Sequence, residues 1–471
     1  MSIDVFMPAT RLARLLRERK VSATEVAKAF IAQIERVNPK VNAIVTFLPE
    51  LALKQAKALD RRRPDPRRPL WGLPIAYKDV VPTKGIRTTY GSPVYREHVP
   101  SEDHLVVERL AAAGVVTLGK TNTPEFAAGS QTFNAVFGAT LNPYDPSRTC
   151  GGSSGGAAVA VACGMLPFAD GSDLGASLRN PGSFCNVAGF RPSAGRVPSW
   201  PAADAWQSMT VMGSLGRTVA DSALLFSAMA GPDDRDPTSI PEAGGVFRRS
   251  LKRDFRKVRV AWSRDLGGLP VEAQVTRTLE AARGALRSLG CVVEDAEPDL
   301  SGAEEPFHAL RAVGFVQRYG ELYRTQRDKL KKDVVWNIEQ GLGLDGERVA
   351  RANGLRTALY HRMREFMQRY DFLCLPTSQV LPFPVSEPWP AEINGVRFDN
   401  YLDWMKSCYF ITVTGHPAIS VPGGFSPGGL PVGLQIVGRY RDDLGVLQLA
   451  HAFESATGHW KQRPPLTAVK E

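Results

Sequence analysis

The sequence predicts an α/β protein, built as one large domain with a helical excursion. Short apolar segments of strand length alternate with amphipathic helical segments along most of the 471 residues. The composition, with 43% hydrophobic and 23% charged residues, is that of an ordinary globular protein and argues against disorder. No internal repeat or low-complexity linker divides the chain, so one domain fits better than two tethered domains.

The N-terminal segment is expected to be helical. Residues 21–38, "VSATEVAKAFIAQIERVN", place a capping box of Ser22 and Glu25 ahead of apolar residues at helical spacing. A second helix is predicted at 49–61. Strands are then expected at 72–80, 115–120, 258–263, 291–298, 370–378, 417–425 and 431–438, and helices at 103–114, 156–165, 274–290 and 443–458. Residues 301–394 are aromatic and charged, and we expect them to be mostly helical.

Charge and cysteine content narrow the function classes. The net charge of +10 is concentrated in residues 61–68, 247–257 and 327–332, and such runs are more typical of solvated surface than of a nucleic-acid site. No basic motif interleaved with aromatic residues supports a nucleic-acid partner. The six cysteines and seven histidines form no metal-ligand spacing, so we expect no metal and no other cofactor. No secretory or membrane-spanning segment is apparent, which predicts a reduced, cytoplasmic protein.

One segment matches a phosphate-binding loop letter for letter. "GVVTLGKT", from Gly114 to Thr121, fits the pattern G-x-x-x-x-G-K-[ST]. Such a loop exposes backbone N–H groups between its glycines, where a strand passes into a helix. Here the intervening residues are strand formers and a helix precedes them. The pattern therefore favours a buried strand with Lys120 at its end, and a P-loop nucleotide-binding protein is the alternative from a different class.

A second segment matches the G-x-S-x-G motif of α/β-hydrolases. "GGSSG" satisfies it at Ser153, and "GSSGG" satisfies it at Ser154. In those enzymes the motif follows a strand and works with an Asp and a His. Upstream here lies "LNPYDPSRTC", which is typical of turn and loop, and nothing marks one histidine as a partner. The histidines available by position are His308, His361, His416 and His451. This interpretation takes second place.

A third interpretation combines a lysine with hydroxyls on two glycine-rich loops. A serine hydroxyl is a poor nucleophile until a base accepts its proton. "GLPIAYKD" places Lys78 at the end of an apolar strand, where burial would lower the pKa of the amine. The hydroxyls come from Ser153, Ser154, Ser172 and Ser177. Taken alone, Lys78 is better explained as a surface lysine with a buried alkyl chain.

The order and spacing of these segments resemble the amidase signature family. Its lysine lies in GLP-h-x-h-K-D, its bridging serine is the first serine of GGSSGG, and its nucleophile lies in GSD-x-GGS-h-R-x-P. These positions match Lys78, Ser153 and Ser177, which are 75 and 24 residues apart, as expected of the family. Further matching segments are "GKTNTPEF", "GATLNPYDPSRT", "FCNVAGFRPSAGRVP", "GSLGRTVAD" and "PAISVPGGF…GLPVGLQIVG". The resemblance covers most of the chain, to about residue 465.

The resemblance implies the amidase signature fold, a large twisted mixed β-sheet covered on both faces by helices. It also implies a mechanism in which neutral Lys78 draws a proton through Ser153, which follows a cis peptide bond. The Oγ atom of Ser177 then attacks an amide carbonyl and forms an acyl-enzyme. The backbone N–H groups that would hold the oxyanion belong to Leu174, Gly175, Ala176 and Ser177. The residues that match supporting positions are Ser154, Asp173 and Arg179.

The resemblance also suggests how the single domain, residues 1–471, is divided. Residues 1–65 would form N-terminal helices, 66–230 the catalytic core, 301–394 a variable helical region lining the substrate entrance, and 395–465 a return to the core sheet. The sequence departs from the family at Ala176, where glycine is usual, at Cys150, where proline is usual, and at Ser172, where threonine is common. Alanine tolerates positive φ badly, so the oxyanion loop should differ slightly if that position requires it.

The predicted reaction is hydrolysis of linear amides, namely neutral aryl or alkyl carboxamides and anilides, with carbamates as a further option. Small residues at Ala127, Ala128 and Gly129 are expected to leave room beside the nucleophile. Other candidates for the pocket, each individually better explained as core, are Met209, Trp336, Trp389, Trp404, Met405, Tyr409 and Phe410. The alternative within the family is the glutaminase subunit of a tRNA-dependent amidotransferase. The expected partner is a small-molecule amide, with the chain as monomer or homodimer.

Overall fold

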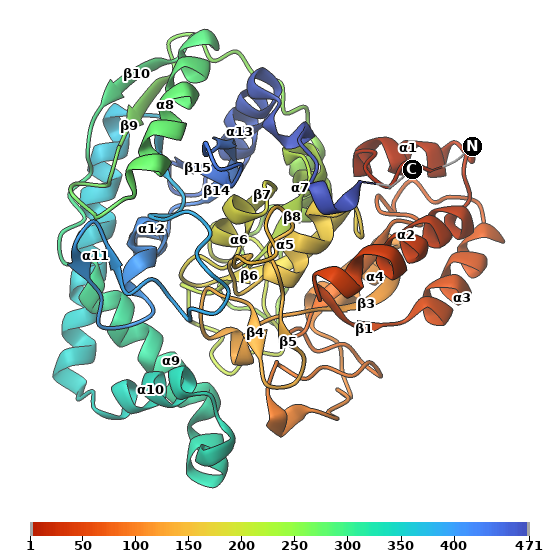
Figure 1. The fold of residues 1–471 in the computed structure, drawn as a ribbon, viewed down its shortest axis with the longest axis horizontal. Helices are drawn as coiled ribbons and strands as arrows, with labels where there is room; N and C mark the ends of the chain where they lie inside the picture. Colours follow the sequence, from red (N-terminus) through yellow and green to blue (C-terminus); the bar gives the residue numbers. More distant parts are fainter. Residues whose placement is uncertain (1–2, 469–471) are drawn as a thin grey trace.

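An eight-stranded mixed sheet runs through the centre of the protein (Figure 1). The computed structural model describes residues 3–468. The strands of this sheet are β6 (Phe168–Asp173), β7 (Ala188–Arg191), β8 (Val211–Gly216), β9 (Arg259–Trp262), β10 (Val292–Asp295), β11 (Phe372–Pro376), β14 (Ala418–Phe425) and β15 (Pro431–Gly438). Their order is β10-β9-β11-β15-β14-β7-β8-β6, with parallel pairing among β10, β9 and β11 and antiparallel pairing elsewhere. The predicted α/β class and large mixed sheet are confirmed.

Helices cover both faces of this sheet, among them α8 and α13. The helices of residues 3–468 are α1 (Ala9–Arg17), α2 (Ala23–Val37), α3 (Pro49–Asp60), α4 (Leu105–Ala113), α5 (Gly155–Ala162), α6 (Arg179–Phe184), α7 (Val219–Met229), α8 (Ala273–Ser288), α9 (Glu304–Gln326), α10 (Lys332–Leu342), α11 (Gly346–Arg369), α12 (Lys406–Thr414) and α13 (Asp443–Thr457). In β11, Phe372 and Cys374 pack into the core shared with α8 and α13, whereas Leu373 and Leu375 pack into the core shared with α11 and α12. Because side chains alternate across a strand, a continuous apolar run fits a strand that is buried on both faces.

A three-stranded sheet lies against the β6 edge. It consists of β1 (Ile44–Phe47), β3 (Val116–Thr121) and β2 (Pro74–Lys78), with β3 in the middle. The predicted strands at 72–80 and 115–120 are β2 and β3, and the capping box of Ser22 and Glu25 is formed. Residues 1–65 also contain a strand that was not predicted, β1, which lies between α2 and α3. Its four residues are too few to establish a strand period, and pairing with β3 decides their conformation.

Three strands of the large sheet, β6, β7 and β8, were not predicted. The β6 segment "FADGSD" contains Gly and Asp, which are depleted in strands and common in turns. Its full-length antiparallel pairing with β8 overrides these local preferences. As a result, the first serine-glycine loop leads into α5, and the second leaves the end of β6.

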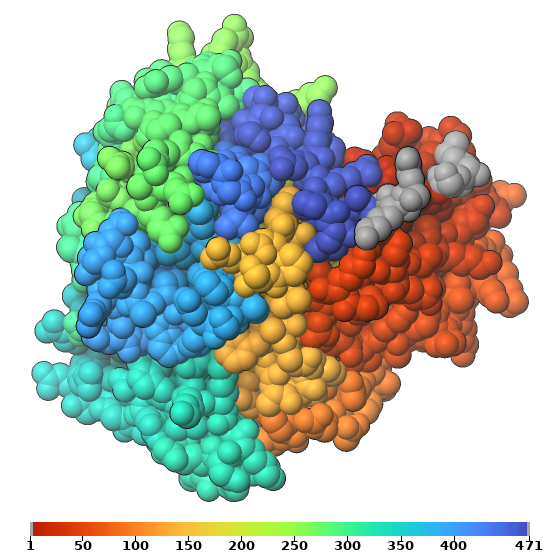
Figure 2. Space-filling model, in the orientation of Figure 1, coloured from red at the N-terminus to blue at the C-terminus, as the bar shows by residue number. Residues whose placement is uncertain are grey.

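Helices α9, α10 and α11 form the predicted helical excursion. They pack against one another at the lower left of the molecule, and the chain then re-enters the large sheet as β11 (Figure 1). Figure 2 shows the surface of this region meeting that of the segment before residue 150. Two short hairpins complete the fold, β4 (Phe133–Asn134) with β5 (Gly138–Ala139) and β12 (Glu392–Ile393) with β13 (Val396–Arg397). Within residues 3–468, no helix is long and apolar enough to cross a membrane.

The segment that matches a phosphate-binding loop is a buried strand, as predicted. Gly114 ends α4 in a left-handed conformation, and every residue of β3 is buried. Gly119 has φ +144°, and a Cβ atom there would lie 1.8 Å from the carbonyl oxygen of Thr46 on β1. Gly114 therefore ends a helix, and Gly119 allows the close approach of β1 to β3. Lys120 donates to the backbone oxygen of Val81 and is thus held inside the protein.

We predict that Gly119→Ala destabilises the fold by more than about 1 kcal/mol, because the new methyl group collides with backbone at a positive φ. Gly284→Ala is the control: Gly284 lies inside α8, where a Cβ meets nothing within 4 Å, so alanine should stabilise by about 0.5–1 kcal/mol. Urea unfolding of both variants measures the difference. Equal stability of the two variants would contradict the strand-crossing role.

Candidate active site

Lys78 ends β2 with its amine in the protein interior. The Nζ atom donates to the Oγ atoms of Ser153 (2.7 Å), Ser154 (3.0 Å) and Ser172 (3.1 Å). Within residues 3–468, Lys78 forms no ion pair with a carboxylate. Burial disfavours the charged amine and lowers its pKa to about 7, although Asp170 and Asp173 oppose the shift. A substantial neutral fraction is therefore present near neutral pH.

The backbone of the first serine loop is fixed from one side by hydroxyl groups. Ser130 Oγ donates to the carbonyl of Gly152, and Thr132 Oγ1 donates to that of Gly151. The Gly152–Ser153 peptide bond is cis, as the resemblance implied. Ser154 immediately precedes α5, and its backbone N–H donates to the carbonyl oxygen of Ser177 at 3.2 Å, which ties the two serine loops together.

The second serine loop is anchored by a buried charge network. Asp173 receives Nε and Nη2 of Arg179 at 3.1 and 2.9 Å, Nη1 of Arg191 at 3.2 Å, and the backbone N–H of Leu178. Burial disfavours the carboxylate, but the two guanidinium charges outweigh it and lower the pKa of Asp173 to about 2. Arg179 also donates to the carbonyl of Gly175, which fixes the loop at its turn.

Between these anchors, four backbone N–H groups are free of protein acceptors. In the described chain, those of Leu174, Gly175, Ala176 and Ser177 make no hydrogen bond. Ala176 does not have a positive φ, so alanine replaces the usual glycine there without backbone strain. Ser177 Oγ likewise makes no hydrogen bond within residues 3–468. This arrangement can accept a carbonyl oxygen that gains negative charge.

These groups open into one cavity of about 580 Å³. Ser153, Ser172 and Ser177 lie in its wall together with the backbone of 174–176. Of the three small residues expected there, Ala127 and Gly129 line the cavity. Ala128 instead packs with Phe126 and Phe315 in a separate apolar cluster. The opposite wall comes from one face of α9, namely Phe307, Arg311, Phe315, Arg318 and Tyr319.

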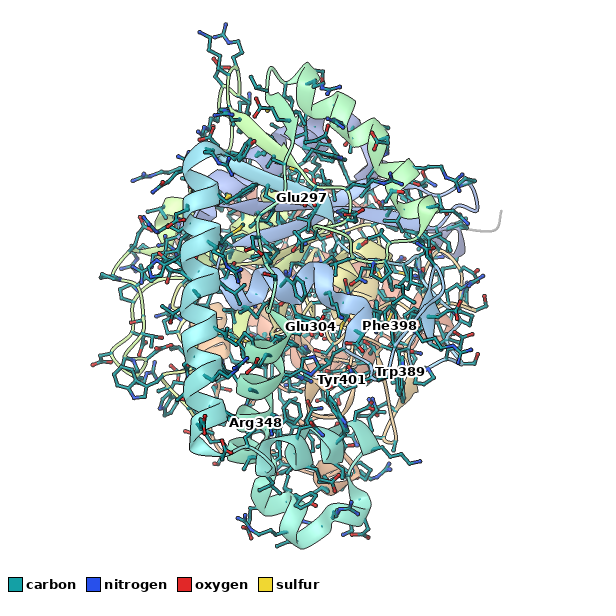
Figure 3. All side chains as sticks on the ribbon, turned by 90° about the vertical axis from the view of Figure 1, so that its left-hand side faces the viewer. Glu297, Glu304, Arg348, Trp389, Phe398 and Tyr401 are labelled. Carbon is teal, nitrogen blue, oxygen red and sulfur yellow. The ribbon has the colours of Figure 1, made fainter. Side chains whose placement is uncertain are left out.

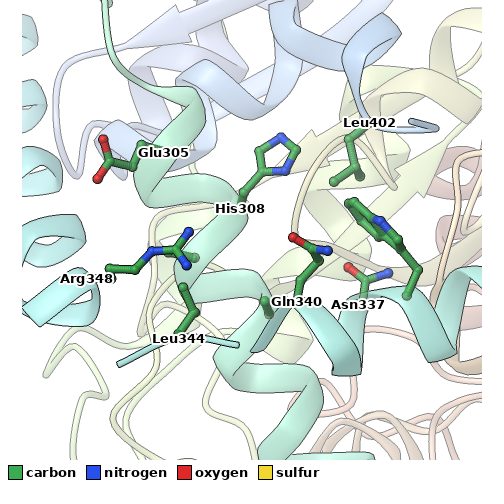
Figure 4. A pocket seen from close by; sticks show the side chains of 10 residues that line it. Glu305, His308, Asn337, Gln340, Leu344, Arg348 and Leu402 are labelled. Atoms are coloured by element: carbon green, nitrogen blue, oxygen red, sulfur yellow. The ribbon is translucent and has the colours of Figure 1, made fainter. Parts of the chain in front are cut away.

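Most of the predicted aromatic lining lies elsewhere. Met405 borders the cavity. The residues found in or packed against the core around α11 and α12 are Met209, Trp389, Trp404, Tyr409 and Phe410. Trp336 borders a smaller cavity of about 160 Å³ between α9 and α10. Figure 4 shows this second cavity, with Asn337 and Gln340 of α10 across from His308 of α9.

Two contributions to the site were missed from the sequence. Ser172 was named there as one of four loop hydroxyls and as a departure from threonine but was given no role in the site, and it is the third hydroxyl on Lys78. The α9 wall repeats every four residues at Phe307, Arg311, Phe315 and Tyr319, which is the spacing of one helix face. That spacing identifies a face, but only the packed structure reveals what the face meets.

The serine–histidine alternative finds no support in the geometry. In the described chain, none of the four candidate histidines hydrogen-bonds to Ser153 or Ser154. His416, for example, contacts Thr414, and burial lowers its pKa to about 4. Cys150 and Cys185 are buried, free thiols near the two serine loops.

The amidase family profile matches residues 25–447 of this chain. The chain belongs to the amidase signature family. An acylamidase of Rhodococcus erythropolis is 35% identical over 98% of both chains. A glutamyl-tRNA(Gln) amidotransferase subunit from Dehalococcoides mccartyi (strain ATCC BAA-2266 / KCTC 15142 / 195) is 36% identical over 96% of this chain and 97% of its own. The structure of a bacterial aryl acylamidase of the amidase signature family aligns with a TM-score of 0.90 at 28% identity, covering 99% of both chains. This amidase is accordingly a hydrolase that acts on amides.

We predict that Asp173→Asn lowers the free energy of unfolding of the amidase by about 3–5 kcal/mol, because Arg179 and Arg191 would stay buried without a counter-charge. Asp145→Asn is the control, since its pair with Arg148 is more than one-third exposed and contributes less than about 1 kcal/mol. Urea unfolding compares the two variants. A loss at Asp173 no larger than at Asp145 would refute the anchoring role.

Proposed function

We propose that the protein hydrolyses linear amide C–N bonds with Ser177 as nucleophile, Ser153 as proton bridge and Lys78 as base. The observation that carries the proposal is the buried amine of Lys78, hydrogen-bonded to Ser153 beside the cavity that Ser177 lines. Because burial lowers the pKa of this amine to about 7, it can accept a proton at physiological pH.

In the first half of the reaction, Ser177 Oγ attacks the amide carbonyl carbon. Its proton passes to Ser153 Oγ, while the proton of Ser153 passes to Lys78 Nζ. The carbonyl oxygen gains negative charge and is stabilised by the free N–H groups of residues 174–177, each of which can contribute about 3 kcal/mol. Lys78 then returns a proton through Ser153 to the leaving nitrogen, the C–N bond breaks, and an acyl ester remains on Ser177.

In the second half, water takes the place of the amine. Lys78 and Ser153 accept its proton as it attacks the ester carbon, and the carboxylic acid leaves as Ser177 recovers its hydroxyl hydrogen. The link from Ser177 to Ser153 is not formed within residues 3–468, so the relay requires a rotation about the side-chain bond of one serine. Such contacts often tighten only when substrate is bound.

The proposed substrates are aryl or alkyl amides and anilides, with carbamates as a further option, since these share the carbonyl and the leaving nitrogen. The aromatic side chains of Phe307, Phe315 and Tyr319 supply apolar surface for such groups. The acylamidase and aryl acylamidase relatives support this class. We further propose that residues 301–394 line the substrate entrance, since α9 carries these side chains.

Glutaminase activity is the second candidate. It is favoured by the 36% identity to the amidotransferase relative and by the acidic and basic residues, Asp204 and Arg318, that border the cavity. These two could face the ammonium and carboxylate of a free amino acid. Ammonia release from glutamine, compared with aniline release from an anilide, separates the two candidates.

We predict that a fluorophosphonate probe labels Ser177, as mapped by mass spectrometry, and that Ser177→Ala and Lys78→Ala each lower anilide hydrolysis by at least about 10³-fold. Ser147→Ala, which changes an exposed serine, is the matched control and should leave the rate unchanged. Circular dichroism would check that the variants remain folded.

Label on Ser153 or Ser154 with Ser177 unmodified would contradict this assignment and favour a different nucleophile. Near-normal hydrolysis by folded Ser177→Ala or Lys78→Ala would overturn it as well.

A further inference from the structure

Arg311 places a buried positive charge in the wall of the catalytic cavity. It lies on α9 and is only 6% exposed, and it borders the same cavity as Ser177. In the described chain it forms no ion pair with a carboxylate. Three other buried arginines, Arg179, Arg191 and Arg196, each have a carboxylate oxygen within 3.2 Å. Buried Arg217 instead donates to three backbone carbonyl oxygens, an enclosure that Arg311 does not have within residues 3–468. A buried guanidinium is costly unless it is paired, so the missing anion needs an explanation.

The neighbours of Arg311 hold its guanidinium in place without neutralising it. Nε donates to the side-chain oxygen of Asn337 at 3.1 Å, and Nη2 donates to the hydroxyl of Tyr401. Tyr401 is itself braced by Trp389, with ring centroids 6.4 Å apart, and Figure 3 shows the two side by side. The guanidinium carbon lies 4.6 Å from the ring centroid of Phe315. All of these partners are uncharged.

One edge of the guanidinium remains available. Nη1 makes no hydrogen bond with residues 3–468, and it is not among the enclosed side-chain atoms that lack a partner. It therefore keeps access to the open space of the cavity. Guanidinium N–H groups fixed in this way match the two oxygens of a carboxylate.

The position of Arg311 relative to the reaction centre follows from α9. Phe307 contacts the oxyanion loop, since a Cβ atom on Gly175 would lie 3.3 Å from its Cζ atom. Arg311 follows four residues later on the same helix face, about 6 Å along the axis. An amide held with its carbonyl at residues 174–177 can therefore extend along α9 and reach Arg311 after a few bonds.

We propose that the substrate of this amidase carries a carboxylate, remote from the scissile amide, which Arg311 binds. The inference rests on the proposed function and deepens it. The sequence predicts neutral aryl or alkyl amides as substrates, whereas this inference requires an anionic group on either the acyl side or the amine side of the amide. The substrate carboxylate supplies the counter-ion that Arg311 lacks within residues 3–468. The scissile amide itself remains uncharged.

Matched substrate pairs test this inference. One arm uses anilides of dicarboxylic acids, with two to six methylene groups between the amide and the carboxylate, each beside an anilide ending in methyl. A second arm uses amides of 4-aminobenzoate beside amides of 4-methylaniline, so the arms distinguish a carboxylate on the acyl side from one on the amine side. We expect kcat/KM of the wild type to favour at least one carboxylate by about tenfold or more over its neutral match.

Arg311→Gln should abolish this preference, mainly through KM, and keep kcat for the neutral anilide within about threefold. Arg311→Lys should restore part of it. Arg324→Gln is the matched control, because Arg324 lies on the same helix, is exposed and pairs with Glu321 outside the cavity, so it should leave the preference unchanged. If Arg311→Gln fails to fold, the preference of the wild type and the effect of Arg311→Lys still decide the matter.

The inference is overturned if kcat/KM for no carboxylate substrate exceeds that for its neutral match. It is also overturned if Arg311→Gln lowers kcat/KM for the charged and the neutral substrate by the same factor, as loss of a purely structural arginine would. In either case Ser177 would still be labelled and neutral anilides still cleaved, so the proposed function would stand. If the wild type cleaves no member of either arm and Ser177 is not labelled, both proposals fail.

Discussion

The amine of Lys78 is hydrogen-bonded to three hydroxyl groups and, within the described chain, to no carboxylate. The chemistry of the site depends on these uncharged partners, because they let the amine lose its charge. A carboxylate at hydrogen-bonding distance would stabilise the charged amine and make it a poor base. Two aspartates do lie near, but their oxygens are engaged elsewhere. Asp173 is paired with Arg179 and Arg191, and Asp170 receives the backbone N–H of Lys78. Burial therefore prevails, and the pKa of the amine falls.

The scaffold brings together segments that are far apart in the chain. The strand β2 delivers Lys78, the turn before α5 delivers Ser153, and the loop after β6 delivers Ser177 and the free N–H groups. The helix α9 closes the opposite side with aromatic rings and Arg311. Under the proposed function, the core that carries the reacting groups is separate from the helical wall that would contact the substrate. We infer that the same core can serve different amides when the helical wall changes.

Part of this could be predicted from the sequence. Lys78, Ser153 and Ser177 stand in motifs whose residue types and spacing are specific, and the cis peptide followed from the resemblance. The strand at Gly119 could be told from a phosphate loop because its neighbours are strand formers. By contrast, β6 was missed because local preferences favour a turn there. The aromatic residues near 404–410 were candidates for the pocket that were each better explained as core, since composition alone does not say which face of α12 meets the cavity. The role of Arg311 could not be predicted, because it follows from the lack of a carboxylate partner within residues 3–468, which only the packed structure reveals.

The most direct test of the account is to titrate the Lys78 amine itself. The protein would be labelled with ¹³C at the lysine Cε atoms and followed by NMR as pH rises, with the Lys78 signal assigned by its loss in Lys78→Ala. The account predicts a titration midpoint near pH 7, with the amine neutral above it and charged below. A midpoint close to 10, the usual value for lysine, would mean that the amine is charged at physiological pH and would contradict its role as the base.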